Sequence, residues 1–220
     1  MDVFIIGING RIGRLLAGEL RDRGDTVRGL VRRGRDGTDL AARGVQTCIG
    51  DVGAMTPQDL AYAVHGADVI VFTAGSNGGE RHVTQAIDLH GVTKAVEAGN
   101  LAGVPRFALV SVFPEAWRER ELPEDEEYYF AAKKEAEVVL THSDLDWLIL
   151  RPALLTDGPV TGRVSIGPAE RHGQISRHDV AVALALLLHE PRISRQILEL
   201  NEGSTPTKSA IARCVRSPAA

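Results

Sequence analysis

Two side chains that could do acid–base chemistry stand four residues apart, Tyr129 and Lys133. On a helix this spacing places both on one face and within contact distance. A nearby ammonium group stabilises phenolate, so we expect Lys133 to lower the pKa of Tyr129 from its usual value of about 10. A tyrosine tuned in this way can protonate a carbonyl oxygen as a hydride arrives, or remove that proton in the reverse reaction. Ser111, at the end of a predicted strand, could donate a second hydrogen bond to the same oxygen.

A glycine-spaced turn near the N-terminus is the second candidate site. Gly7, Gly10 and Gly13 follow an apolar run over residues 3–6 and lead into a helical pattern. Glycines so placed allow a tight bend, a close approach of the backbone to a pyrophosphate, and close packing of the helix on its strand. The free N–H groups and the positive dipole end of the helix face the anion. The turn therefore predicts a dinucleotide phosphate cradle. The other turn residues assigned to it are Asn9, Arg11 and Ile12.

Strand and helix patterns alternate along the chain and would position these residues. Strands are predicted over 3–6, 26–31, 45–49, 68–72, 106–111, 146–150, 160–166 and 196–200. Helices are predicted from the glycine turn to near residue 24, and over 57–65, 80–101, 126–142 and 180–188. Ser176 with Asp179 forms a capping pattern before the last of these helices. The alternation favours right-handed parallel crossovers, and so an α/β fold with a doubly wound parallel sheet between two helical layers.

The residues after the second strand bear on the choice of cofactor, because ligands of such sheets bind outside the carboxyl ends of the strands. An acidic side chain there would suit the ribose diol of NAD, whereas arginine suits the 2′-phosphate of NADP. The chain has Arg32 and Arg33 at this place, with Asp36 and Asp39 nearby. We expect NADP (NADPH) to be favoured over NAD.

Further cofactor contacts are expected at the ends of the other strands. Asp51 could accept a hydrogen bond from the adenine amino group, or it could cap the following turn. The small residues after the fourth strand would line the middle of the cofactor, and Lys133 would also bind its ribose. The residues assigned to the cofactor at this edge of the sheet are Asp51, Val52, Thr73, Ala74, Gly75, Lys133 and Pro152.

Composition sets limits on the class of protein. The chain has 220 residues and a formal net charge of −4, which favours one domain over residues 1–220 and argues against a general nucleic-acid binder. The segment after about residue 152 is expected to form a small lobe on the substrate side. The start of the chain shows no secretory pattern, and the longest later apolar run is shorter than the roughly 20 residues that span a bilayer. We expect a cytoplasmic protein with a small-molecule substrate and no membrane partner.

Metal and disulfide chemistry are not expected. Cys48 and Cys214 lie in different predicted elements and do not form a metal-type pair, so reduced thiols are the default. The histidines are scattered without ligand spacing, and we assign no metal site. The oligomeric state stays open.

The chain resembles the atypical short-chain dehydrogenase/reductases, and within them a small single-domain NAD(P)-binding subgroup with NmrA-like and biliverdin-reductase-B-like members. The motifs that carry this resemblance are Gly7-x-x-Gly10-x-x-Gly13, Asp51, Ser111, Tyr129-x-x-x-Lys133, Arg151-Pro152 and the stretches 145–157 and 175–181. The resemblance implies a Rossmann fold with strand order 3-2-1-4-5-6-7. It also implies that Ser111, Tyr129 and Lys133 occupy the catalytic positions.

Three positions depart from the pattern of that subgroup. Asn9 stands where a small hydroxyl residue is usual, Val112 where a second serine often follows Ser111, and Ala153 where glycine is common. These departures leave the cofactor turn intact and concern the contacts of the reacting oxygen.

Several functions fit these residues. The first is an NADPH-dependent reductase that passes hydride to a small carbonyl, quinone or flavin-like acceptor, with Tyr129 as proton donor. Alternatives are a non-catalytic NmrA-like NAD(P) redox sensor, an NAD-dependent epimerase/dehydratase-like enzyme, and an α/β domain that binds another nucleotide. Sugar-nucleotide epimerases share these motifs but usually have a longer carboxyl-terminal lobe. Phe113, Pro114 and Trp117 could wall an apolar substrate pocket.

Overall fold

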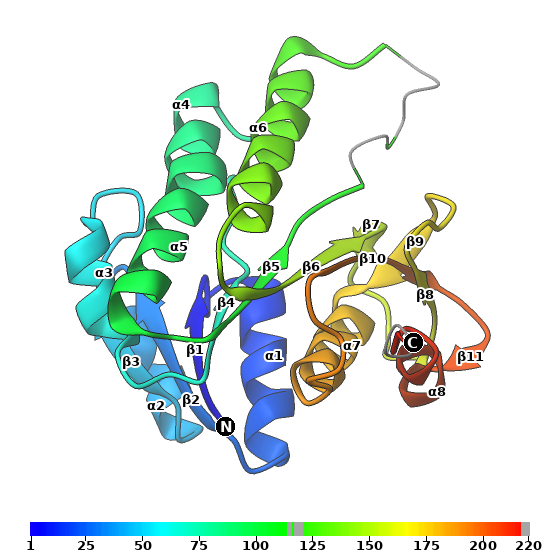
Figure 1. Ribbon diagram of the computed structural model, residues 1–220, viewed down its shortest axis with the longest axis horizontal. Coiled ribbons are helices and arrows are strands. Elements are labelled where there is room, and N and C mark those ends of the chain that lie inside the picture. The colour runs from blue at the N-terminus through cyan, green and yellow to red at the C-terminus, as the bar shows by residue number, and fades with distance from the viewer. Residues whose placement is uncertain (114–115, 117–120, 217–220) are drawn as a thin grey trace.

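A mostly parallel sheet crosses the molecule in the computed structural model, which describes residues 1–113, 116 and 121–216 (Figure 1). Within the described residues this sheet has nine strands in the order β11-β8-β10-β6-β5-β4-β1-β2-β3. Its strands are β1 (Asp2–Ile6), β2 (Thr26–Val31), β3 (Gln46–Ile49), β4 (Val69–Phe72), β5 (Arg106–Val110), β6 (Asp146–Pro152), β8 (Arg163–Gly167), β10 (Gln196–Glu202) and β11 (Thr205–Pro206). Two short strands, β7 (Leu154–Thr156) and β9 (Gln174–Ser176), pair in parallel beside it.

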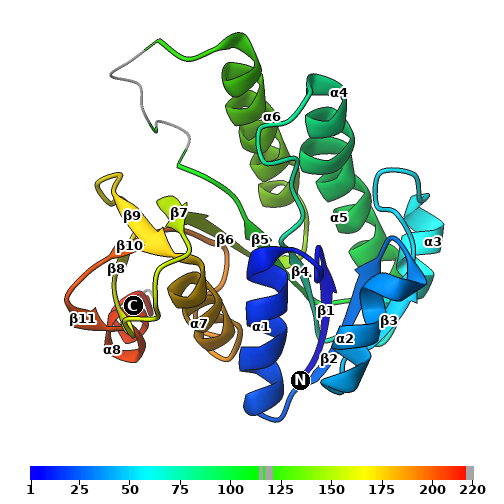
Figure 2. The same cartoon turned by 180° about the vertical axis from the view of Figure 1, so that it is seen from behind.

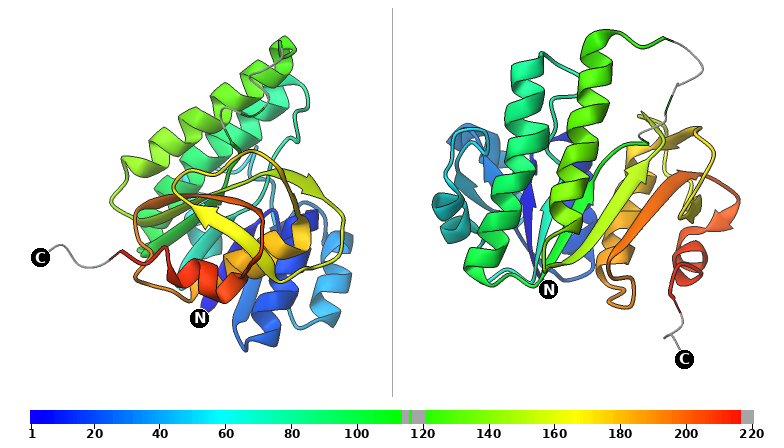
Figure 3. Two further views of the ribbon diagram at one scale, coloured as in Figure 1. Left: turned by 90° about the vertical axis from the view of Figure 1, so that its right-hand side faces the viewer. Right: turned by 45° about the horizontal axis from the view of Figure 1, so that its top comes forward.

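Helices cover both faces of the sheet. They are α1 (Arg11–Asp22), α2 (Thr38–Ala42), α3 (Pro57–Val64), α4 (Arg81–Thr84), α5 (His90–Ala102), α6 (Glu124–Thr141), α7 (Arg177–Leu188) and α8 (Thr207–Ala212). Helices α1 and α7 pack together on one face, whereas α3, α5 and α6 lie on the other (Figure 2 and Figure 3). The fold is thus the predicted three-layer Rossmann-type arrangement.

The apolar run of the first strand explains its place in the middle of the sheet. Val3 and Ile5 belong to the core cluster under α1 and α7, and Phe4 and Ile6 belong to the cluster under α3 and α5. Successive side chains of a strand point to opposite faces, so a continuous apolar run is buried on both.

The predicted strand order is confirmed for the seven parallel strands, β3-β2-β1-β4-β5-β6-β10. Beyond β10 the sheet departs from the all-parallel expectation. Strand β8 runs antiparallel to β10, and β11 runs antiparallel to β8. These antiparallel strands cover the edge that β10 would otherwise expose.

One predicted helix is not regular. The pattern over 80–101 predicts a continuous helix, whereas the structure has α4, a π-helical turn over Gln85–Leu89, and then α5. The wider turn contains Asp88, whose side chain is fully buried. Single π-turns inside helices often occur at functional sites, and this one lies beside the cavity described below.

Helices α3 and α7 begin at side chains that cap them. Thr56 and Asp59 form a capping box at α3, which has Pro57 at its first turn. Ser176 Oγ accepts a hydrogen bond from the backbone N–H of Asp179 at 3.0 Å, which confirms the capping pattern before α7. No helix in the part of the chain described is long and apolar enough to cross a membrane.

Candidate functional site

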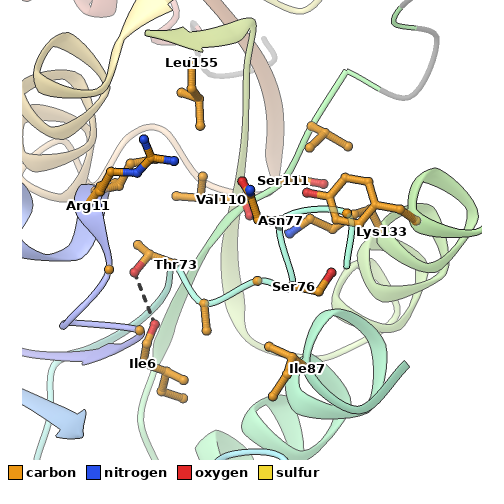
Figure 4. Close-up of a pocket in the computed structure, with 18 of the residues that line it drawn as sticks. Ile6, Arg11, Thr73, Ser76, Asn77, Ile87, Val110, Ser111, Lys133 and Leu155 are labelled. Carbon is orange, nitrogen blue, oxygen red and sulfur yellow. Dashed lines mark hydrogen bonds between the residues drawn. The ribbon is translucent and has the colours of Figure 1, made fainter. Parts of the chain in front are cut away.

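A cavity of about 990 Å³ lies at the carboxyl ends of β1, β2, β4, β5 and β6. Figure 4 shows Arg11 on one side of it and Ser111 and Lys133 on the other. The predicted site residues that line it are Gly7, Asn9, Gly10, Arg11, Ile12, Arg32, Asp51, Val52, Thr73, Ala74, Gly75, Ser111, Tyr129, Lys133 and Pro152. Gly13 and Arg33 lie outside its lining. The volume is large enough for a dinucleotide-sized ligand to be bound at the edge of the sheet.

The glycine turn is closely packed and admits no side chains at two positions. Gly7 has a φ of +93°, and a Cβ there would lie 2.4 Å from the backbone nitrogen of Ala74. A Cβ at Gly13 would lie 2.3 Å from the carbonyl oxygen of Gly7. Gly13 therefore serves the close packing of α1 on the turn, while Gly7 and Gly10 face the cavity.

Asn9 is fixed by Arg14 from the first turns of α1. The guanidinium group of Arg14 donates to both the side-chain and the backbone oxygen of Asn9. The carboxamide oxygen is occupied by this contact. Asn9 thus stabilises the turn in place of the hydroxyl residue that is usual in the resembled subgroup.

Arg11 connects the turn to the segment that follows Pro152. Its guanidinium donates to Asp157 at 3.1 Å, and Arg177 at the start of α7 donates to the other oxygen of the same carboxylate at 2.7 Å. Both arginines line the cavity. A carboxylate of the protein therefore lies between two cations at the rim of the candidate phosphate site.

The two arginines after β2 have different roles in the structure. Arg32 lines the cavity, whereas Arg33 donates from Nε to Asp36 at 3.1 Å and lies outside the lining. Asp36 also borders the cavity. Only one of the two predicted arginines is therefore in place to meet a 2′-phosphate.

Asp51 and the loop after β4 border the middle of the cavity. One oxygen of Asp51 accepts a hydrogen bond from the backbone N–H of Gly53 at 2.9 Å, so this side chain caps its own turn. The N–H groups of Thr73 and Ala74 both donate to the carbonyl of Ile6, at 2.8 and 3.1 Å. The Thr73 hydroxyl donates to the same oxygen, as the dashed line in Figure 4 shows. These bonds hold the loop against the end of β1.

Ser111, Tyr129 and Lys133 come together at one end of the cavity. The Lys133 ammonium lies 5.9 Å from the centre of the Tyr129 ring and donates to the carbonyl of Val110 at 3.3 Å. It also pairs with the carboxylate of Asp88 at 3.2 Å. The Ser111 hydroxyl is buried and has no hydrogen-bond partner among the described residues. It is available to an oxygen of a ligand.

The expected lowering of the Tyr129 pKa is wrong. Burial raises the pKa of Tyr129, the Lys133 charge opposes this, and the Asp88 charge adds to the rise. Burial acts to lower the pKa of Lys133, but the negative charge that Tyr129 carries once it ionises and the charge of Asp88 outweigh burial, and the pKa is raised. Desolvation, which the four-residue spacing does not reveal, thus decides the sign for the tyrosine. Both groups are held in their protonated forms.

Sequence reasoning missed Asp88 and the wall contributed by the carboxyl-terminal segment. Asp88 stands four residues before Val92 and so shares its buried helix face; a charge on that face was the available signal. Phe113 lines the cavity as expected, and its ring meets that of His172 edge to face at 5.4 Å. Pro114 and Trp117 lie outside the described residues. The other wall residues from the segment after Pro152 are Ala153, Leu154, Leu155, His172 and Arg177.

Comparisons with known proteins agree with this geometry. The chain matches the NAD(P)H-binding family over residues 7–191. It is 36% identical over 219 residues to YhfK of Bacillus subtilis, described as an uncharacterized sugar epimerase, with 97% of this chain and 100% of that protein covered.

Solved structures of similar proteins share the whole fold. The oxidoreductase ylbE of Lactococcus lactis has a TM-score of 0.85 at 27% identity, covering 97% of this chain and 96% of that chain. ChuY of Escherichia coli, described as an anaerobillin reductase, has a TM-score of 0.77 at 27% identity, covering 92% of this chain and 97% of that chain.

Proposed function

The chain belongs to the NAD(P)H-binding family, and from this premise we propose that it is an NADPH-dependent reductase of a small carbonyl, quinone or flavin-like acceptor. One observation carries the proposal. A glycine cradle stands at one part of the cavity, and Ser111, Tyr129 and Lys133 meet at another. The cradle fits a pyrophosphate because Gly7 and Gly10 line the cavity with backbone at the start of α1, where free N–H groups and the positive end of the helix dipole favour an anion.

The side chains supply the proton and the hydrogen bonds of the reduction. NADPH, when bound, supplies a hydride. As the hydride would reach the carbonyl carbon of the acceptor and its C=O π bond would break, the oxygen would take the proton of the Tyr129 hydroxyl. The acceptor would become an alcohol, and Tyr129 would be left as a tyrosinate, which would regain a proton from water. Ser111 donates a hydrogen bond to the reacting oxygen, and the Lys133 ammonium stabilises the tyrosinate.

The hydroxyl of Tyr129 carries a proton at neutral pH, as a proton donor requires, and burial raises its pKa further. The description of ChuY as an anaerobillin reductase supports the direction of reduction.

The preference for NADPH is proposed from Arg32. Its side chain lines the cavity after β2, and none of its atoms is in a salt bridge among the described residues. An arginine so placed can bind the 2′-phosphate through charge-assisted hydrogen bonds. The expected order of affinity is NADPH above NADH.

The first prediction concerns Tyr129→Phe. Loss of the proton donor should lower kcat for carbonyl reduction by about 100-fold or more while the Kd for NADPH stays unchanged. Steady oxidation of NADPH is followed with a panel of aldehydes, ketones, quinones and flavins, and binding is followed by calorimetry. Tyr128→Phe is the matched control, because Tyr128 lies near Arg81 and outside the cavity lining.

Two results would contradict the proposal. Unchanged carbonyl reduction by Tyr129→Phe would remove the tyrosine from its role. Cofactor binding by the wild-type chain without NADPH oxidation by any acceptor would instead indicate the non-catalytic redox sensor.

A further inference from the structure

Asp88 is a charged side chain buried next to the candidate proton donor. It is fully shielded from solvent and lies in the π-helical turn between α4 and α5. A carboxylate is costly to bury unless it is paired and hydrogen-bonded. Its burial therefore requires partners whose charge and hydrogen bonds offset the unfavourable free energy of desolvation.

The carboxylate of Asp88 joins two parts of the site. One oxygen accepts a hydrogen bond from the backbone N–H of Ser76 at 2.8 Å, in the loop that follows β4. The other lies 3.2 Å from the Lys133 ammonium of α6. A Cβ at Gly75 would lie 3.1 Å from this second oxygen, so glycine at 75 leaves room for the carboxylate. The loop and the lysine are thus held by one side chain.

The other charged groups around Lys133 do not replace Asp88. Tyr129, one turn earlier on α6, is a phenol in its neutral form. Glu137, one turn later, is committed to Arg151, whose guanidinium donates to both its oxygens at 2.9 and 2.6 Å. From β5 the contact is the uncharged carbonyl of Val110 at 3.3 Å. Asp88 is therefore the carboxylate that directly balances the buried ammonium.

We propose that Asp88 is a positioning residue that holds Lys133 charged and in place, and that it thereby keeps the Tyr129–Lys133 pair fully protonated before each turnover. The use of this proton in reduction rests on the proposed function. Without the carboxylate, a buried ammonium beside a phenol is easier to deprotonate. Because the two groups titrate as a coupled unit, the first proton can leave either the Tyr129 oxygen or the Lys133 nitrogen. In both cases the pair loses this proton at a lower pH.

The test is Asp88→Asn, which keeps an oxygen for the Ser76 N–H and removes the charge. Tyr62→Phe and Tyr128→Phe are introduced as a background, since the chain has three tyrosines and Tyr129 then gives the whole tyrosinate absorbance. Lys133 is followed through the NMR shift of its ¹³C-labelled ε-carbon. Both readouts use the protein without cofactor or acceptor.

In the Asp88→Asn variant the lower of the two apparent pKa values of Tyr129 and Lys133 should fall by about one unit or more, compared with the same background that keeps Asp88. Glu97→Gln is the matched control, because it removes a carboxylate from the exposed side of α5 and should leave both titrations in place. With an acceptor that is reduced, the pH at which kcat falls on the alkaline side should decrease in Asp88→Asn together with the pKa of the pair. Unmoved titrations, or equal shifts in both variants, overturn the proposal.

A second measurement needs no change at Asp88. In the background with Tyr129 alone, tyrosinate should form above the ordinary pKa of about 10, and titration at or below that value overturns the proposal even if Asp88→Asn does not fold. A different result would contradict the proposed function and leave the role of Asp88 in place. If the titrations behave as expected and no acceptor is reduced, the role of Asp88 stands and the reductase assignment fails.

Discussion

Neighbouring residues of the same type can differ in function because their surroundings differ, and Arg32 and Arg33 are an example. The first borders the cavity, and the second is paired with Asp36. Their sequence positions alone assign both to the cofactor. The side-chain directions after β2 separate them.

Arg32→Ala should weaken NADPH binding by about 10- to 100-fold and leave NADH binding nearly unchanged, since a hydrogen bond to a charged group contributes roughly 1.5–3 kcal/mol. Calorimetric Kd values for both cofactors measure the ratio. Arg33→Ala is the control and should keep the preference. A wild-type chain that binds NADH more tightly than NADPH would contradict the assignment of Arg32.

The spacing of residues in the sequence predicts which side chains meet, but it does not predict the sign of their pKa shifts. Tyr129 and Lys133 lie together as their helical spacing predicts. The sign of the tyrosine pKa shift was wrong because it depends on burial by distant segments. The sequence pattern does not indicate a role for Asp88, because a four-residue helical repeat does not show that the π-helical turn contacts the loop after β4.

The element that the structure explains most fully is the turn between β1 and α1. Gly7→Ala would place a Cβ 2.4 Å from the backbone nitrogen of Ala74 at a φ of +93°. We expect it to lower the free energy of unfolding by more than about 1 kcal/mol and to weaken NADPH binding. Denaturant unfolding and calorimetry measure the two effects.

Gly18→Ala is the matched control within the next helix. A Cβ at Gly18 of α1 meets nothing within 4 Å, and alanine has the higher helix propensity. This change should raise the free energy of unfolding by about 0.5–1 kcal/mol. If Gly7→Ala is as stable as Gly18→Ala, the packing of the turn against Ala74 does not constrain it.

Long elements were predictable and very short ones were not. The alternation of apolar runs and helical patterns gave the seven parallel strands and the main helices close to their observed bounds. Strands β7, β9 and β11 have two or three residues, too few for a period to appear. Their pairing depends on where the chain returns to the sheet.

Across the whole molecule, the fold class and the membership of an NAD(P)-binding family are confirmed. The carboxyl-terminal segment brings β7, His172 and the start of α7 to the cavity rim. Through Asp157 it meets Arg11 of the first helix at 3.1 Å. This contact links residues from distant parts of the chain, which no local pattern can show.

Asp157→Asn should strengthen NADPH binding by up to about fivefold. The Asp157 carboxylate would compete with a phosphate for Arg11 and Arg177, and an ion pair whose carboxylate is exposed contributes at most about 1 kcal/mol. Calorimetry at low and high salt measures the gain, which should shrink as salt screens the charges. Asp22→Asn at the far end of α1 is the control. An unchanged affinity would show that the carboxylate does not compete.

The two edges of the sheet have a consequence for how copies of the protein meet. Strand β11 ends the sheet on one side with two residues, and one of them is Pro206, whose nitrogen carries no hydrogen. Strand β3 ends the other side with four residues. Short edges and a missing N–H offer little template for a strand from another chain. We therefore expect the two edges to add few strand pairs between copies of the protein.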